Sequence, residues 1–112
     1  MTEQSDISLP AAFAALGDPT RFAIVDRLIS QGPQSAGALQ DVAAISAPAI
    51  SRHLRVLREA GVIRQEIRAQ HRIYSVDAEA MRAIGTWTMT KREFWDGSLD
   101  RLVRMLEDRK GD

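Results

Sequence analysis

The 112-residue sequence contains no cysteine, which excludes disulfide bonds, thiolate metal sites, cysteine nucleophiles and thiol redox sensing. It also lacks a long apolar run. The longest one, residues 9–16, has eight residues and includes Pro10, whereas a membrane-spanning helix needs about 20. No Lys or Arg precedes Arg21, although a secretory signal begins with positive charge. These absences predict a cytoplasmic protein without a membrane partner.

Net charge is missing as well, since 15 Lys and Arg residues balance 15 Asp and Glu residues. Taken alone, this balance argues against a uniformly basic protein that coats nucleic acid. The length and the 45% hydrophobic content are those of one globular domain. We therefore expect a single domain over residues 1–112, in which residues 1–8 are flexible, residues 9–76 form the core and residues 77–110 form a terminal helix.

Helix signals divide the first half of the chain into four predicted helices. The first covers residues 9–16. The second begins at Pro19, behind the cap residue Asp18, and ends before Gly32. The apolar stripe of this second helix comprises Phe22, Val25, Leu28 and Ile29.

Two further helices follow, joined by a tight turn. The third predicted helix covers residues 36–42 and has Ser35 as its cap. The fourth covers residues 47–60 and has Ser46 as its cap. Gly61 follows it and suits the left-handed conformation that commonly ends a helix.

The chain changes character after the fourth helix. Residues 62–68 and 71–76 are rich in β-branched and aromatic side chains, which predicts a two-stranded β-hairpin. Asp77 then caps a long last helix, and two glycines within it allow a kink. This order of elements predicts a mainly α fold with a small β-hairpin, the winged helix-turn-helix, followed by a long C-terminal helix.

Charge is unevenly distributed along the chain. Residues 1–45 contain two Arg and five acidic residues, a net charge of −3, and residues 76–112 contain seven basic and eight acidic residues, a net charge of −1. Residues 46–75 contain six Arg and two Glu, a net charge of +4. A single Arg is usually solvated surface, but six on the fourth helix and the hairpin, the elements with which this fold contacts DNA, favour a nucleic-acid partner.

Helical geometry predicts which face of the fourth helix is exposed. At ~100° per residue, Ile50, Leu54 and Leu57 fall together and face the core. The opposite face begins with small residues, which allow close approach to the major groove, and then carries two arginines. The N-terminal end of the helix favours a phosphate. The predicted DNA contacts of this helix are Ser46, Pro48, Ala49, Ser51, Arg52, His53 and Arg55.

Two of these assignments have a plain structural alternative. His53 lies on the flank of the exposed face, where a partly buried histidine that packs the helix is nearly as good an interpretation. The hairpin tip is either a solvated polar turn or a wing that lies along the DNA backbone or the minor groove. In the second case the DNA contacts of the tip are Arg68, Gln70, His71 and Arg72.

The last helix carries apolar side chains well beyond the small domain. Part of them must pack on the chain's own core. However, the stripe that begins at Trp95 and ends at Leu106 extends about three more turns, and a stripe that outlasts its own core usually contacts another chain. Because duplex DNA is commonly bound with two-fold symmetry, we expect a homodimer.

Several stretches make the sequence similar to a known family. They are ALGDPTRFAIVDRLI (15–29) and SAPAISRHLRVLREAGVI (46–63), and the hairpin segment RIYSVD (72–77) fits as well. Over residues 9–77 the chain resembles the arsenic-repressor (ArsR/SmtB) family of winged helix-turn-helix regulators. The last helix, with FWDGSLDRL (94–102), resembles one branch of that family.

This resemblance implies a homodimeric transcriptional repressor that binds double-stranded DNA at a palindromic operator and leaves it when a signal arrives. It places DNA reading on residues 46–55 and the wing on residues 68–72. It also implies that the first and last helices form the dimer interface. The interface residues are then Leu9, Phe13, Trp87, Phe94, Trp95, Leu99, Leu102 and Leu106.

The sequence departs from the family in two places. Many members sense metals through Cys in the third helix or through Asp and His pairs in the last helix, but here residues 36–42 lack Cys and the last helix lacks His. Because transition metals need such ligands in clusters, we expect no metal site and no cofactor. The wing turn, Ala69-Gln70, lacks the glycine common in the family, which predicts a tip longer than two residues.

Other functions fit the residues less well. A winged-helix module that binds an acidic protein through its arginine face, without operator specificity, is the main alternative. An enzyme is not expected, because the sequence has no Gly-rich phosphate loop and no Ser/His/Asp pattern. The inducer stays open between a small organic ligand, a metal bound by carboxylates, and none.

Overall fold

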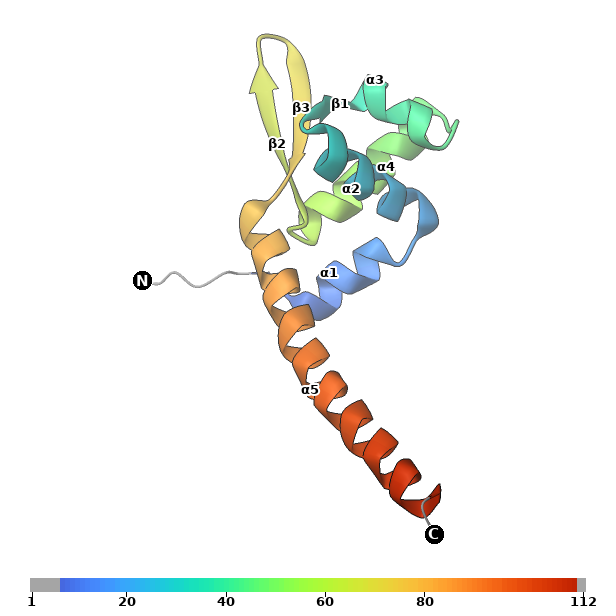
Figure 1. Ribbon diagram of the computed structural model, residues 1–112. Helices are drawn as coiled ribbons and strands as arrows, with labels where there is room; N and C mark the ends of the chain where they lie inside the picture. The colour runs from blue at the N-terminus through green and yellow to red at the C-terminus, as the bar shows by residue number, and fades with distance from the viewer. Residues whose placement is uncertain (1–6, 111–112) are drawn as a thin grey trace, which may run out of the picture.

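The computed structural model describes residues 7–110, and Figure 1 shows a small head from which one long helix extends. The predicted flexible segment 1–8 therefore falls mostly outside the described residues. Ser8 lies within them. Its side chain accepts a hydrogen bond from the Ala11 backbone N–H at 3.3 Å and caps the first helix.

The described residues form helices, three strands and one 3₁₀ turn. In chain order they are α1 (Leu9–Leu16), α2 (Pro19–Gln31), β1 (Gln34–Ser35), α3 (Ala36–Leu39), η1 (Gln40–Val42), α4 (Ala47–Glu59), β2 (Ile63–Arg68), β3 (His71–Val76) and α5 (Ala78–Lys110). The predicted winged helix-turn-helix with a long C-terminal helix is confirmed. The third predicted helix differs only at its end, where the α-helix tightens into the 3₁₀ turn.

Side-chain caps fix where the helices begin. Each cap oxygen accepts a hydrogen bond from a backbone N–H in the first turn, which that turn otherwise leaves without a partner. The caps predicted from the sequence all make this bond, namely Asp18, Ser35, Ser46 and Asp77. After α4, Gly61 has a φ of 79°, the left-handed conformation expected at a helix end.

The sheet contains one strand more than the predicted hairpin. β1 pairs antiparallel with β3, with Gln34 opposite Tyr74 and Ser35 opposite Ile73, so that the strand order is β1-β3-β2. The two-strand prediction was therefore incomplete. A strand of two residues is too short to show an alternating pattern in the sequence. Its pairing ties the base of the wing to the segment between α2 and α3.

The wing turn is shorter than predicted. Arg68 pairs directly with His71, so only Ala69 and Gln70 connect the two strands. The expectation of a longer tip was wrong, because Ala69 itself takes a φ of 56° where the family often has glycine. Positive φ at the first turn residue alone is the pattern of a type II′ turn.

The positive φ of Ala69 leads to a prediction about stability. An L-residue at positive φ destabilises the folded state by roughly 1–2 kcal/mol. A glycine removes this strain, but it gives the unfolded chain more conformational entropy, which lowers stability by about 0.4–1 kcal/mol. We therefore expect Ala69→Gly to raise the free energy of unfolding by roughly 0.5 kcal/mol, measured by urea denaturation. Gln70→Gly, at negative φ, is the control and should lower it. A loss of stability in Ala69→Gly would contradict the prediction.

The core of the head lies between the helices and the inner face of the sheet. α4 contributes Ile50, Leu54 and Leu57, as predicted. The remaining core residues are Ala12, Ala15, Ile24, Val25, Leu28, Leu39, Val62, Ile63, Tyr74 and Ala80.

The predicted apolar stripe of α2 was partly wrong. Val25 and Leu28 are buried, but Phe22 is 60% exposed and Ile29 is 57% exposed. Ile24 takes their place in the core. Because the core side of α2 is centred on Ile24, Val25 and Leu28, Phe22 and Ile29 lie about 100° around the helix from that centre.

α5 is one continuous helix of 33 residues, despite the two glycines within it. Its first turns pack against the head, where Ala80 is buried, Met81 and Ile84 are partly buried, and Trp87 contacts Phe13 of α1. The rest projects away from the head, as Figure 1 shows, and carries a series of half-exposed apolar side chains. Among the described residues, no helix is apolar enough over sufficient length to cross a membrane.

Candidate nucleic-acid interface

α4 presents a polar face on the side opposite its buried residues. Arg52 and Arg55 are exposed there, and neither has an ion-pair partner among residues 7–110. Both guanidinium groups are therefore free to form bidentate bonds with phosphate or with a guanine edge. The other predicted contacts at the start of α4 lie on the same side. Ser46, Pro48 and Ser51 are exposed, and Ala49 is half-buried.

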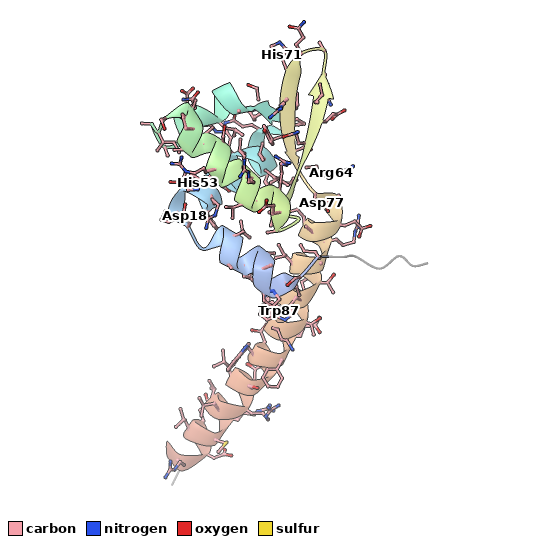
Figure 2. All side chains as sticks on the ribbon, turned by 180° about the vertical axis from the view of Figure 1, so that it is seen from behind. Asp18, His53, Arg64, His71, Asp77 and Trp87 are labelled. Atoms are coloured by element: carbon pink, nitrogen blue, oxygen red, sulfur yellow. The ribbon has the colours of Figure 1, made fainter. Side chains whose placement is uncertain are left out.

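The wing carries its basic residues on both faces. Residues directly opposite in an antiparallel pair share a face, so Arg68 lies with His71, and Arg72 lies with Ile67. Arg68 Nη2 is 3.2 Å from Glu66 Oε1, an exposed ion pair along β2. Figure 2 shows His71 at the far end of the wing. All four residues predicted for the tip are exposed: Arg68, Gln70, His71 and Arg72.

The side chain of His53, in α4, is directed towards α2 and its cap residue Asp18. Its Nδ1 lies 3.2 Å from Arg21 Nη1 and 3.9 Å from Asp18 Oδ2, and Figure 2 shows His53 beside Asp18. Because a guanidinium can only donate, Nδ1 accepts and the ring proton lies on Nε2. Of the two interpretations of His53 from the sequence, these contacts favour the packing one. Its Nε2–H stays available as a donor.

Arg21 joins three helices, a role that sequence reasoning missed. Its Nε donates to the carbonyl oxygen of Ala15 in α1 at 2.7 Å, while its Nη1 reaches His53 in α4. The only sequence signal for it is its position in the stretch that carries the family resemblance. The contact fixes the position of α4 relative to α1 and α2.

The environment of Asp18 leads to a prediction about how stability depends on pH. The backbone N–H of Arg21, which bonds to the carboxylate, lowers the pKa of Asp18 below its ordinary value of 3.8. Burial raises this pKa, but the charge of Arg21 and the backbone N–H of Thr20 lower it further, so that the net shift is downward. Because the folded pKa is the lower one, the carboxylate stabilises the fold above the unfolded pKa, and this stability is lost as pH falls through the folded pKa. Asp18→Asn keeps a capping side chain. Its Tm should therefore fall less between about pH 5 and pH 2 than that of the wild type.

The control for this prediction is Asp26→Asn, an exposed position on the same helix. Its Tm should follow the wild-type curve. An Asp18→Asn curve parallel to the wild type would contradict the role assigned to this carboxylate.

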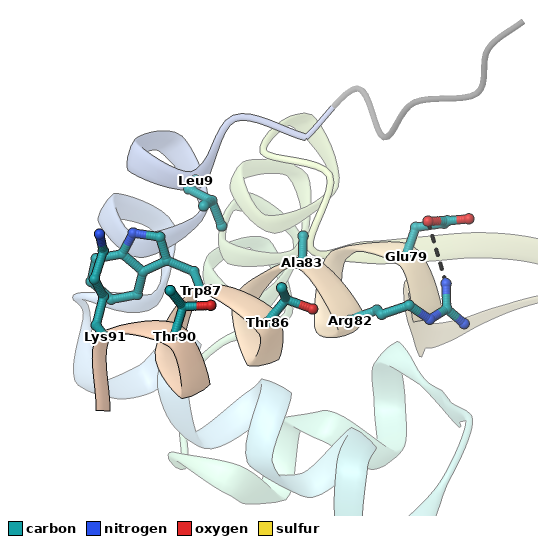
Figure 3. A pocket seen from close by; sticks show the side chains of 8 residues that line it. All are labelled: Leu9, Glu79, Arg82, Ala83, Thr86, Trp87, Thr90 and Lys91. Atoms are coloured by element: carbon teal, nitrogen blue, oxygen red, sulfur yellow. Dashed lines mark ion pairs between the residues drawn. The ribbon is translucent and has the colours of Figure 1, made fainter. Parts of the chain in front are cut away.

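The residues predicted for the dimer interface fall into two groups. Leu9 and Trp87 line an open groove of about 540 Å³ along α5, shown in Figure 3, with the Glu79–Arg82 ion pair at one end and Lys91 at the other. Phe13 packs on Trp87 with ring centroids 5.4 Å apart. The second group lies beyond the head on α5 and comprises Phe94, Trp95, Leu99, Leu102 and Leu106, which are 50–62% exposed.

No metal centre is visible in the part of the chain that the structure describes. Over residues 7–110, no three His, Cys, Asp or Glu side chains lie close enough together to hold a metal ion. Two features remain. The helix α4, which a turn joins to α3, presents two exposed arginines that have no ion-pair partner among residues 7–110, and the β-wing carries further basic residues. This is the architecture of a winged helix-turn-helix DNA-binding protein.

Comparison with known proteins identifies the class more closely. A family profile described as a helix-turn-helix domain matches residues 16–66. The HTH-type transcriptional regulator Rv2034 of Mycobacterium tuberculosis is 35% identical over 101 residues, which cover 90% of both chains. The transcriptional repressor SdpR of Bacillus subtilis is 35% identical over 77 residues, covering 69% of this chain and 84% of SdpR.

Solved structures agree with this identification. An ArsR-like transcriptional regulator from Rhodococcus sp. RHA1 superposes with a TM-score of 0.69 at 26% identity, covering 87% of this chain and 91% of that one. The chain belongs to the ArsR family of helix-turn-helix transcriptional regulators. It is thus a DNA-binding regulator and not an enzyme.

Proposed function

We propose that this regulator is a homodimeric repressor of a palindromic operator. Residues 47–60 insert into the major groove, and the wing, residues 62–76, lies on the flanking backbone or minor groove. The observation that carries this proposal is the exposed face of α4. There Arg52 and Arg55 have no ion-pair partner among the described residues 7–110, and they lie opposite the buried Ile50, Leu54 and Leu57. The DNA contacts are Ser46, Pro48, Ala49, Ser51, Arg52, His53, Arg55, Arg68, Gln70, His71 and Arg72.

Two observations support the repressor and the dimer. SdpR, with which the chain shares 35% of its residues over the matched region, is itself a transcriptional repressor. The apolar side chains of α5 and α1 are too exposed for a stable monomer surface, since contiguous apolar patches of this kind usually mark an interface. The proposed interface residues are Leu9, Phe13, Trp87, Phe94, Trp95, Leu99, Leu102 and Leu106.

Footprinting on the DNA upstream of the protein's own gene tests the proposal. We expect protection of an inverted repeat whose half-sites lie about one or two helical turns apart. Affinity for it should fall steeply as salt rises, because phosphate contacts release counterions. Equal, weak affinity for this DNA and for random duplex would overturn the proposal. A pull-down of an acidic protein that survives nuclease treatment would then support the interaction module.

A chelator added to the same binding reactions tests whether a metal contributes. Since no cluster of metal ligands lies among residues 7–110, we expect unchanged operator affinity. A chelator-dependent change would show that a metal contributes to operator binding.

A further inference from the structure

One side chain of α2 bonds to two other helices. Arg21 lies in the first turn of α2. Its Nε donates to the carbonyl oxygen of Ala15 in α1 at 2.7 Å, and its Nη1 donates to Nδ1 of His53 in α4 at 3.2 Å. Because the guanidinium is rigid and planar, these two bonds restrict how α1 and α4 are placed around it. Arg21 therefore forms a rigid link between α1 and α4.

Asp18 fixes the backbone from which Arg21 extends. Its Oδ2 accepts hydrogen bonds from the backbone N–H groups of Thr20 at 2.9 Å and of Arg21 at 3.0 Å. The same oxygen lies 3.9 Å from Nδ1 of His53, and Figure 2 shows the two residues beside each other. The first turn of α2 is thus held firmly at the point where the guanidinium leaves it.

His53 lies on the flank of α4, between its buried and its exposed face. At ~100° per residue, it is ~65° from the centre of the buried row, Ile50, Leu54 and Leu57. Apolar packing of that row is non-directional, whereas a hydrogen bond requires alignment. In the described part of the chain, no other side chain of α4 hydrogen-bonds to another helix. The bond from Arg21 to His53 is therefore the directional restraint on rotation of α4 about its axis.

We propose that Arg21 is a positioning residue for DNA binding, which acts through His53 to fix the orientation of α4 on the head. The proposal rests on the operator binding proposed above. Arg52 directly precedes His53, so a rotation of α4 carries its guanidinium away from the base edges. Hydrogen bonds to base edges require alignment, whereas attraction to phosphates tolerates its loss. Removal of Arg21 should therefore reduce the preference for the operator more than the general affinity for DNA.

The tautomer of His53 gives this contact a spectroscopic signature. Because a guanidinium only donates, neutral His53 carries its proton on Nε2. Nitrogen-15 NMR of the wild-type protein, at a pH where histidine is neutral, should show this Nε2–H tautomer. The sequence has one other histidine, His71, so a spectrum of His71→Gln assigns the signal. A predominant Nδ1–H tautomer would overturn the proposal, and this measurement leaves the contact itself intact.

A double-mutant cycle tests whether Arg21 acts through His53. Fluorescence anisotropy gives the Kd on operator and on random duplex for Arg21→Ala, His53→Ala and the double variant, and circular dichroism confirms that each protein is folded. We expect Arg21→Ala to raise the operator Kd about tenfold in the wild-type background. In the His53→Ala background the same change should alter it by less than about twofold, because the contact is already absent.

Two further variants separate the rigid link from charge. Arg21→Lys should resemble Arg21→Ala, because one ammonium nitrogen does not reproduce two divergent guanidinium bonds. Arg27→Ala is the matched control. It removes the same charge from the same helix, and Arg27 has no ion-pair partner among residues 7–110. Its preference for the operator should equal that of the wild type.

The other outcomes contradict the proposal. Equal losses from Arg21→Ala in both backgrounds would show that Arg21 acts independently of His53. Wild-type affinity in Arg21→Lys would show that charge alone suffices. An Arg21→Ala protein that keeps the full operator preference would overturn only the positioning role. Wild-type protein with equal affinity for both duplexes would overturn the operator proposal, and the positioning role with it.

Discussion

Arg52→Ala is expected to weaken operator binding by about 1–3 kcal/mol, which corresponds to roughly a 5- to 150-fold rise in Kd. Arg52 is exposed on α4 and has no ion-pair partner among residues 7–110. Its loss therefore removes a DNA contact without breaking an interaction within the protein. Because the guanidinium fork matches the acceptor pair on a guanine edge, the loss should be greater on the operator than on random duplex.

Fluorescence anisotropy with operator and random duplexes at one salt concentration measures both affinities. Arg104→Ala, an exposed arginine on α5, is the matched control and should leave operator affinity within a factor of about two. If Arg52→Ala lost equal affinity on both duplexes, Arg52 would be a phosphate contact only. Thermal unfolding should be unchanged, since Arg52 is exposed and forms no ion pair within residues 7–110.

Leu102→Asp is expected to separate the dimer. Leu102 is 50% exposed in one protomer, so the substitution costs the isolated head little. In the proposed dimer the same side chain would be buried, and a carboxylate without a partner there is strongly unfavourable. Operator affinity should fall by about 100-fold or more, because each half-site is then bound by a separate molecule.

Sedimentation equilibrium measures the dimer, and circular dichroism confirms that the helices are retained. Arg104→Asp introduces the same charge on the opposite side of α5 and should leave the dimer intact. A Leu102→Asp protein that still sediments as a dimer would show that α5 contributes nothing to the interface beyond the head.

Local chemistry explains why most of the fold could be predicted. Asp18, Ser35, Ser46 and Asp77 each cap a helix through a bond to a residue two or three positions away, so the sequence alone reveals them. The buried face of α4 follows from helical spacing in the same way. The short strand β1 could not be predicted, since its existence depends on pairing with β3 about 40 residues later.

The errors at the surface have a common origin. Phe22 and Ile29 match a helical stripe, but packing turns a different side of α2 to the core, centred on the buried residues Ile24, Val25 and Leu28. Ala69 was expected to lengthen the wing turn, yet the pairing of β2 with β3 holds it at positive φ.

The candidate site was predictable to the same extent. The exposed arginines of α4 follow from spacing and charge. The contact between Arg21 and His53 spans 32 positions and becomes visible only in three dimensions. What a residue contacts far along the chain is decided by tertiary packing, which the pattern of one segment does not contain.

The unsupported length of α5 also governs how the protein behaves in flow. The radius of gyration of the chain is 19.2 Å and its longest extent is 71 Å, whereas a compact chain of this size has a radius of gyration of about 13 Å. Such a protomer experiences more friction than a sphere of equal mass. On a gel-filtration column it should therefore elute early and imitate a larger species. Shape-independent mass measurements are the ones that distinguish one chain from two.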